Sequence, residues 1–301
     1  MSSEYDVWFT DDASAFLARA GEHLAQDPVT GTVVSTTAQR FADTGAPEDL
    51  PYGWFVVVSG PTGEIDGVAM RTAPFPPYPL YLLAMSDAGA EALGHALVAR
   101  SEDTGEEIGG INGLRPASDI VAGIVAAHAG NEVQVSMHSR LHELGTLSAA
   151  RPVAGSLRPV RADEAELALA WIREFFLDAN EQAGRDRNDG HHADHFSRAD
   201  IEQKLADDVL RFWVDEDDRP VHLTGWNPPA YEVARVGPVF TPKEQRGKGL
   251  ASAAVAQVSA ELQEAGNRVI LFTDQANPTS NAIYQALGYE AVADTIELRL
   301  A

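Results

Sequence analysis

The sequence predicts an α/β protein made of two domains, and three observations support this prediction. The chain has 301 residues, more than the roughly 100–200 residues that are usual for one domain. Apolar runs of strand length alternate with longer segments of helical periodicity. The same order of elements, a hairpin, a third strand and a helix, occurs once in each half. We therefore expect two domains, at about residues 1–150 and 156–301.

The expected elements follow this order in both halves. In the first half, three strands and a helix are predicted at residues 54–58, 65–72, 80–85 and 88–100. In the second half, the corresponding elements are predicted at residues 211–214, 220–226, 231–240 and 250–265. The stretch at residues 147–157 contains Pro152 and Gly155 and has no apolar periodicity, so we expect the linker between the domains there.

The composition excludes several classes of function. The 45 acidic and 22 basic residues give a net charge of −23, which disfavours nucleic acid and anionic lipid as partners and attracts amines, or serves solubility alone. The chain has no cysteine, which excludes disulfides, thiolate nucleophiles and acyl-cysteine intermediates. Because no run of about 18 apolar residues and no signal-like N-terminus occur, we expect no membrane partner and a cytoplasmic location.

The segment at residues 246–251, Arg-Gly-Lys-Gly-Leu-Ala, lies between an apolar run at 233–240 and an alanine-rich helical pattern. Two glycines and no bulky side chain at the start of a helix leave backbone N–H groups free, and the helix dipole adds positive potential. This pattern is typical of a pyrophosphate-binding turn. A plain surface turn would have the same six residues.

A second strand and helix follow this turn. Residues 268–273 form a short apolar run after the helix, which completes a βαβ unit. Asn277 before Pro278 predicts an N-cap followed by proline at the first helical position, and Gly288 predicts the end of that helix. The helix therefore spans residues 278–287 and carries Asn281 and Tyr284, three residues apart, on one face.

Two separated motifs in this half resemble the GNAT N-acetyltransferase superfamily, whose members bind acetyl-coenzyme A. The matching residues are Arg246, Gly249 and Ala251 in the first motif and Asn277, Tyr284, Gly288 and Tyr289 in the second. The resemblance covers about residues 157–301, and residues 1–150 look like a degenerate copy, as in tandem members. It implies two GNAT-like domains, each with a mixed, mostly antiparallel central sheet flanked by helices.

The resemblance implies an enzyme that transfers an acetyl group directly from acetyl-coenzyme A to a primary amine of a small molecule or peptide. The residues implied to bind the cofactor are Val239, Phe240, Thr241, Arg246, Gly247, Lys248, Gly249, Leu250, Ala251, Asn277 and Asn281. Pantetheine amides can pair with the main chain as an added strand would. Pro238 lacks a donor, which suits a strand that diverges from its neighbour.

Tyr284 is the catalytic residue that the resemblance implies. A tyrosine with an ordinary pKa of about 10 stays protonated at neutral pH and can supply a proton to the departing thiolate. The same residue could instead be a packing aromatic of an amphipathic helix. The base that deprotonates the amine stays unassigned, with Glu232, Asp274 and Glu174 as candidates by position.

The first half lacks the glycine turn. At the corresponding junction it has residues 84–89, Ala-Met-Ser-Asp-Ala-Gly, where Asp87 can cap the helix and occupy the place of a phosphate. We therefore expect one cofactor per chain.

Two further patterns leave alternatives open. His191, His192 and His195 lie in a polar loop, for which we expect no metal. A non-catalytic acyl-coenzyme A sensor or interaction module would carry the same cofactor motif. The acceptor and the acyl group also stay open, since the mycothiol synthases share the tandem layout.

Overall fold

The computed structural model describes residues 5–48, 50–182, 184–187 and 192–301. The chain divides into two compact units. Unit 1 contains Met1–Ser139 together with Ala293–Ala301, and unit 2 contains Arg140–Val292. Within the described ranges, no helix is long and apolar enough to cross a membrane.

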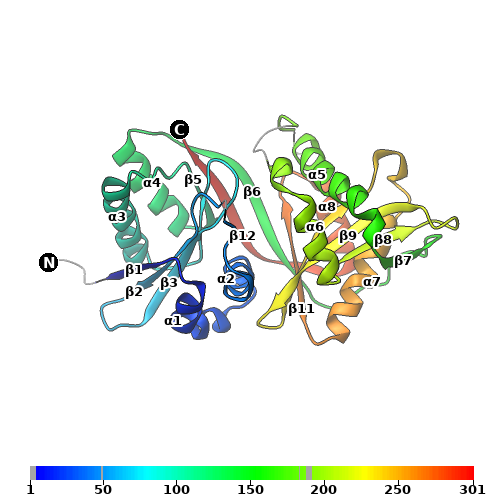
Figure 1. The fold of residues 1–301 in the computed structure, drawn as a ribbon, viewed down its shortest axis with the longest axis horizontal. Coiled ribbons are helices and arrows are strands. Elements are labelled where there is room, and N and C mark those ends of the chain that lie inside the picture. The colour runs from blue at the N-terminus through cyan, green and yellow to red at the C-terminus, as the bar shows by residue number, and fades with distance from the viewer. Residues whose placement is uncertain (1–4, 49, 183, 188–191) are drawn as a thin grey trace. The chain divides into compact units, whose positions relative to one another are not determined.

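Unit 1 is a sheet covered by helices on both faces (Figure 1). Its elements are β1 (Asp6–Thr10), α1 (Ala13–Gln26), α2 (Thr32–Thr44), β2 (Trp54–Ser59), β3 (Ile65–Arg71), β4 (Leu80–Leu82), α3 (Asp87–Thr104), β5 (Gly110–Leu114), α4 (Ala117–Ala129) and the first part of β6 (Val133–Leu144). Every residue of β2 is buried, because its side chains point alternately to the two faces of the sheet and helices cover both faces. Phe55 and Val57 pack with α1 and α2, whereas Val56 and Val58 pack with α3 and α4.

The last strand of the chain, β12 (Tyr289–Leu300), completes the sheet of unit 1. It pairs antiparallel with β5, from Thr295 opposite Leu114 to Arg299 opposite Gly110. Leu298 and Leu300 of β12 are buried in the core shared with α3 and α4. The structural units therefore differ from the expected ranges 1–150 and 156–301, because a C-terminal strand pairs within unit 1.

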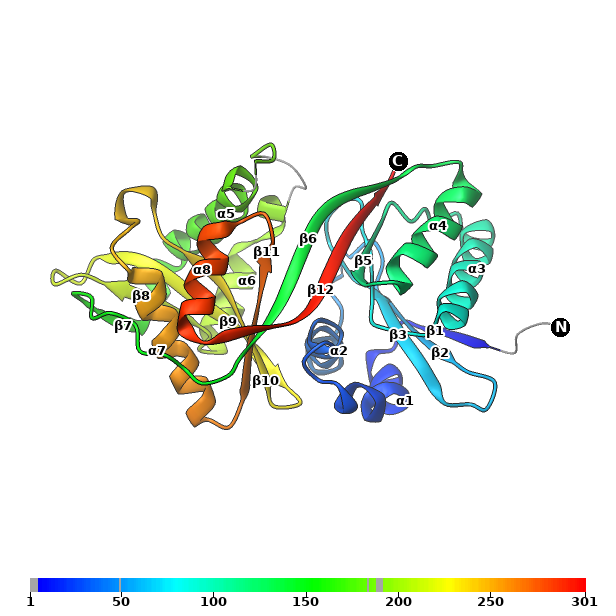
Figure 2. The ribbon, with the colours of Figure 1, turned by 180° about the vertical axis from the view of Figure 1, so that it is seen from behind.

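Unit 2 contains the rest of the chain. Its elements are the end of β6, β7 (Ser156–Pro159), η1 (Ala162–Glu164), α5 (Ala165–Gln182), η2 (His192–His195), α6 (Arg198–Ala206), β8 (Leu210–Val214), β9 (Pro220–Ala230), β10 (Val233–Phe240), η3 (Lys243–Gln245), α7 (Leu250–Glu264), β11 (Arg268–Asp274), α8 (Pro278–Leu287) and the start of β12. The strand order is β6-β11-β10-β9-β8-β7. Helices α5 and α6 pack on one face, and α7 and α8 pack on the other (Figures 1 and 2).

The expected α/β fold with mostly antiparallel sheets is confirmed, and the helix predicted at residues 278–287 is α8. Strand β9 runs four residues beyond its expected end at residue 226. Pro228 and Pro229 lack N–H groups, and β9 accommodates them with an irregular register between Asn227 and Ala230. Strand β4 ends at Leu82, earlier than the expected residue 85.

The segment expected to be a linker, residues 147–157, packs within unit 2. Val153 and Leu157 contact the buried cluster that contains Leu250 at the start of α7. The indole Nε1 of Trp213 donates a 2.9 Å hydrogen bond to the carbonyl of Ala154. These contacts hold the segment against α7 and β8, so it is part of unit 2 where the sequence predicted a linker.

Candidate functional site

Strands β10 and β11 of unit 2 diverge toward their C-terminal ends. They pair in parallel from Val233 opposite Arg268 to Val236 opposite Leu271, but β10 continues to Phe240 and β11 to Asp274. The register of β10 with β9 also shifts between Val236 and Val239. Pro238, which cannot donate to a strand ladder, lies in this shift, as the sequence predicted. The parting strand ends form what we call the slot.

The phosphate-type turn, residues 246–251, follows β10 after the short helix η3. Gly247 and Gly249 have φ angles of 76° and 84°, a region that favours glycine. Gly249 is the N-cap of α7 and provides no side-chain cap, and the first turn of α7 has no acidic residue. A Cβ added at Gly247 would meet nothing within 4 Å. The turn therefore presents free backbone N–H groups and the positive end of a helix on an open side.

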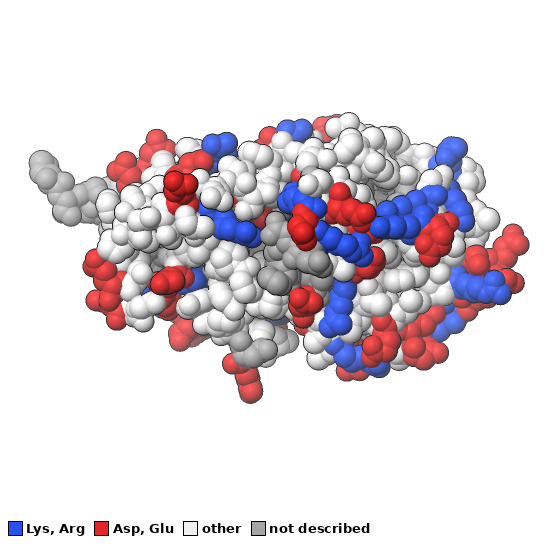
Figure 3. Space-filling model, turned by 90° about the horizontal axis from the view of Figure 1, so that it is seen from above, with Lys and Arg blue, Asp and Glu red and all other residues white. Residues whose placement is uncertain are grey.

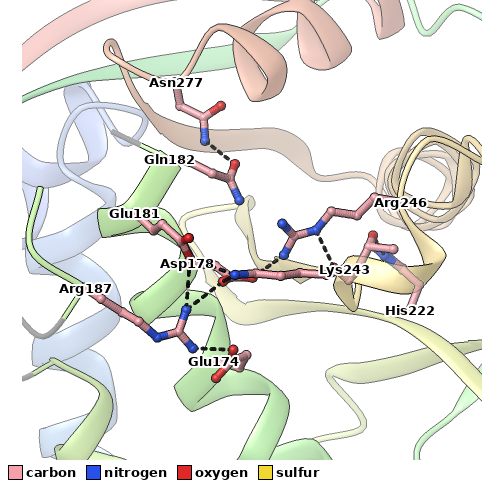
Figure 4. Close-up of polar contacts among 10 residues, drawn as sticks. Glu174, Asp178, Glu181, Gln182, Arg187, His222, Lys243, Arg246 and Asn277 are labelled. Atoms are coloured by element: carbon pink, nitrogen blue, oxygen red, sulfur yellow. Dashed lines mark hydrogen bonds and ion pairs between the residues drawn. The ribbon is translucent and has the colours of Figure 1, made fainter. Parts of the chain in front are cut away.

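The two cations of the motif have protein partners in this structure. The Nε of Arg246 donates a 3.0 Å hydrogen bond to the carbonyl of Thr241, and its guanidinium forms an ion pair with Asp178 of α5 (Figure 4). The Nζ of Lys248 donates to Gln245 Oε1 at 2.6 Å. Arg246, which the resemblance implies to bind the cofactor, is thus directed to α5 in this structure.

A third cation near the turn was missed by the sequence reasoning. A Cβ added at Gly249 would lie 3.9 Å from Nη2 of Arg151. Arg151 is exposed, and no residue that the structure describes forms a hydrogen bond or ion pair with its side chain. Its position follows from the packing of residues 147–157 against α7, which no local sequence pattern indicates.

Asp178 is the centre of a charged cluster on α5 (Figure 4). Its side chain is only 4% exposed and lies near three cations, Arg246, Arg187 at 3.0 Å and Lys243 at 3.7 Å. The Nζ of Lys243 donates a 2.8 Å hydrogen bond to the carboxylate of Glu181. This bond lowers the pKa of Glu181, and the positive charge of Arg187 lowers it further. Blue and red side chains also lie together on the surface shown in Figure 3.

Helix α8 places the second motif beside the slot. The Oδ1 of Asn277 accepts the backbone N–H of Ser280 at 3.1 Å, so Asn277 is the predicted N-cap. Its Nδ2 donates to Gln182 Oε1 of α5 at 3.0 Å. Asn281 donates to the carbonyl of Asn277 at 2.9 Å and accepts from Thr273 at 2.6 Å. The Asn281 amide is therefore held by the protein itself.

Tyr284 lies in the core on the α8 side of the sheet and is 8% exposed. Its ring meets that of Tyr289 edge-on, with centroids 5.9 Å apart. Burial raises the pKa of Tyr284 far above its usual value. Its hydroxyl has no hydrogen-bond partner among the described residues. By contrast, the Tyr289 hydroxyl bonds Ser259 Oγ at 2.7 Å, and burial raises its pKa to about 12.

Two of the three candidate bases form ion pairs with arginines. Asp274 forms a 2.6 Å ion pair with Arg185, and Glu174 forms one with Arg187. Glu232 lies in the turn between β9 and β10, with a φ angle of 59°. The structure therefore assigns no base among these three residues.

His222 is a buried polar residue that the sequence reasoning did not single out. Its Nδ1 lies 2.7 Å from Thr241 Oγ1, and its Nε2 lies 2.6 Å from Thr224 Oγ1. Burial lowers its pKa to about 3, so the ring is neutral at physiological pH. The histidine thereby fixes the side chain of Thr241, which lies between the end of β10 and the turn.

Replacing His222 with glutamine should flatten the pH dependence of stability. Below pH 6.5 the unfolded chain binds a proton at this histidine that the folded protein does not bind, so stability is lost as the pH falls toward 3. We expect the free energy of unfolding of H222Q to change by about 2 kcal/mol less between pH 7 and pH 5 than that of the wild type. Urea titrations measure it. His95→Gln, at an exposed position of α3, should follow the wild type.

The corresponding junction of unit 1 is closed. Ser86, not Asp87, is the N-cap of α3 and accepts from the backbone of Gly89 at 3.1 Å. The carboxylate of Asp66 accepts from Ser86 Oγ at 2.7 Å, and a Cβ added at Gly89 would lie 1.9 Å from that carboxylate. A carboxylate thus fills the helix end, while β4 and β5 stay paired through Leu82.

No group of three or more His, Asp or Glu residues suited to a metal ion occurs in the part of the chain that the structure describes. His191 and the side chain of His192, from the predicted polar loop, lie outside that part.

Comparisons with known proteins agree with this fold. A family model described as FR47-like protein matches residues 216–298, and no curated protein matches the chain. The GCN5-related N-acetyltransferase from Sphaerobacter thermophilus is similar, with a TM-score of 0.62 and 15% identity over 98% of this chain and 95% of that one. An acetyltransferase of the GNAT family from Colwellia psychrerythraea has a TM-score of 0.57 and 11% sequence identity, over 98% of this chain and 99% of that one. A tandem GNAT protein from the clavulanic acid biosynthesis pathway has a TM-score of 0.56 and 15% sequence identity, over 97% of this chain and 98% of that one. The whole chain therefore has the fold of these acetyltransferase structures, and residues 216–298 match the FR47-like family model.

Proposed function

We propose that unit 2 transfers an acetyl group directly from acetyl-coenzyme A to a primary amine of a small molecule or peptide. The observation that carries this proposal is the slot, because the strand end that forms it is followed, after η3, by a helix with no acidic residue in its first turn. An extended arm that ends in a pyrophosphate has the shape and charge for this path. The names of the similar structures, which are acetyltransferases, support the acetyl group.

The residues present fit coenzyme A. The backbone N–H groups of residues 247–251 would hold the pyrophosphate, and Arg151 and Lys248 are close enough to add charge-assisted hydrogen bonds. The strand end at Val239, Phe240 and Thr241 would pair with the amides of the pantetheine arm.

The chemistry needs two proton movements. The amine nitrogen forms a bond to the acetyl carbon, the carbon–sulfur bond breaks, and the thiolate takes a proton while the attacking amine loses one. Tyr284 would hold the proton for the sulfur, since its raised pKa keeps the hydroxyl protonated at neutral pH. The chain has no cysteine, so no acyl-cysteine forms, which agrees with the proposed direct attack by the amine.

Calorimetry and turnover test the proposal together. We expect one coenzyme A site per chain, because Asp66 closes the corresponding place in unit 1. Thiol release from acetyl-coenzyme A, measured across a panel of primary amines, should exceed hydrolysis with at least one of them. Tight binding with no transfer to any amine would favour a non-catalytic acyl-coenzyme A sensor. Two equal sites would contradict the closed junction of unit 1.

A further inference from the structure

Two side chains of α5 reach residues on opposite sides of the slot. Asp178 pairs with Arg246, which follows β10, and Gln182 accepts from Asn277, which follows β11 (Figure 4). Asp178 and Gln182 are four residues apart and therefore neighbours on one face of the helix. A single turn of α5 thus links the two strand ends that diverge.

The two contacts differ in how easily they can open. The Asp178 side chain is 4% exposed and has cations on several sides, so breaking its contacts would leave buried charge without a partner. The bond between Gln182 and Asn277 is a neutral hydrogen bond, and Gln182 is exposed at the last residue of α5. The net contribution of such a neutral hydrogen bond to stability is small. Asp178 is the fixed end of this link, and Gln182 is the end that can open.

Asn277 already uses one N–H donor and one acceptor site of its amide while this link is closed. Its Oδ1 is occupied by the N–H of Ser280, and its Nδ2 donates to Gln182. Asn277 is 8% exposed, so its amide cannot turn freely toward solvent. A ligand that enters between β10 and β11 and needs the N–H that Asn277 directs at Gln182 must therefore take it from Gln182.

We propose that Gln182 is a gate residue that competes with the pantetheine arm of coenzyme A for Asn277. This inference rests on the proposed function, because it assumes that the arm lies between β10 and β11. The phosphate end of the ligand binds at the α7 turn, away from this bond. Only ligands that carry the arm should therefore respond to Gln182.

The test compares coenzyme A with adenosine 3′,5′-bisphosphate, which lacks the arm. Gln182→Ala removes the competing acceptor and should tighten coenzyme A binding about three- to ten-fold in calorimetry. Gln182→Glu supplies a stronger, charged acceptor and should weaken coenzyme A binding by a similar factor, after the change for the bisphosphate is divided out. Neither the alanine variant nor the control Gln203→Ala, at an exposed position of α6, should alter bisphosphate binding.

The experiment distinguishes failure of the Gln182 gate from failure of the proposed function. Unchanged or weaker coenzyme A binding by the alanine variant would overturn the gate, and so would an equal shift for both ligands. A wild-type protein that binds neither ligand would instead overturn the proposed function on which the gate rests. Thermal unfolding shows whether each variant is folded, and the exposed position of Gln182 predicts a melting temperature near that of the wild type.

Discussion

Replacing Ala251 with aspartate is expected to abolish coenzyme A binding while leaving unit 2 as stable as before or slightly more stable. Ala251 is half-buried in the first turn of α7, where the structure has no acidic side chain. A carboxylate there interacts favourably with the helix dipole, by about 0.3–1 kcal/mol. The same charge lies where the pyrophosphate would bind, so repulsion and lost space should weaken binding at least about 100-fold.

The opposite signs of these two effects make the experiment informative. Calorimetry gives the affinity, and urea unfolding gives the stability of the same preparation. Ala251→Asn is the matched control, because its side chain has nearly the same size without the charge, and it should retain more of the affinity. Full binding by the aspartate variant would show that the α7 turn does not hold the phosphates.

Unit 1 already contains the arrangement that this variant would create. The carboxylate of Asp66 lies at the N-terminal end of α3, together with Ser86, and Asp87 lies in the first turn of that helix. Both units therefore have a helix after the third strand of their shared pattern, but only the end of α7 is free of acids. The difference between the two halves is chemical, and it predicts a single cofactor site.

Local signals in the sequence predicted the parts of the site that depend on neighbours along the chain. Asn277, Pro278 and Gly288 determine where α8 starts and ends, and the structure has the predicted bounds. Gly247 and Gly249 adopt the positive φ angles that the turn requires. These features depend on the conformational preferences of single residues, which can be recognised without knowing the tertiary fold.

The contacts that the sequence did not predict join residues far apart in the chain. Asp178 and Arg246 are 68 residues apart, and Gln182 and Asn277 are 95 apart. Strand β12 joins unit 1 because of its pairing with β5, and no pattern within the strand specifies that partner. Arg151 was overlooked because a stretch of small residues without periodicity gives no sign of how it packs.

Replacing Tyr284 with phenylalanine should lower kcat about 10²- to 10⁴-fold, the usual range for loss of a positioned proton donor. Affinity for coenzyme A should change little, because the ring and its packing on Tyr289 are kept. Stability should not fall, since the hydroxyl has no hydrogen-bond partner among the described residues. Single-turnover rates with a good amine acceptor, measured beside calorimetry, separate the chemical step from binding.

Tyr289→Phe is the matched control for this variant. It removes a hydroxyl that bonds Ser259 and should cost about 1 kcal/mol of stability while leaving kcat near the wild-type value. A kcat of Tyr284→Phe equal to that of the wild type would remove Tyr284 from the mechanism.

The pH dependence gives a second, independent check on Tyr284. Because burial raises the folded-state pKa of Tyr284 well above its usual value of about 10, the hydroxyl stays protonated between pH 6 and about pH 10. Any rise in activity over that range must come from deprotonation of the amine or of its base, so the wild type and Tyr284→Phe should share the same acidic limb. The buried tyrosine should affect stability only above about pH 10, where the unfolded chain loses this proton and the folded protein keeps it, so that stability falls as the pH rises. Tyr284→Phe should remove that alkaline loss, which ties the low turnover and the altered pH response to one hydroxyl group.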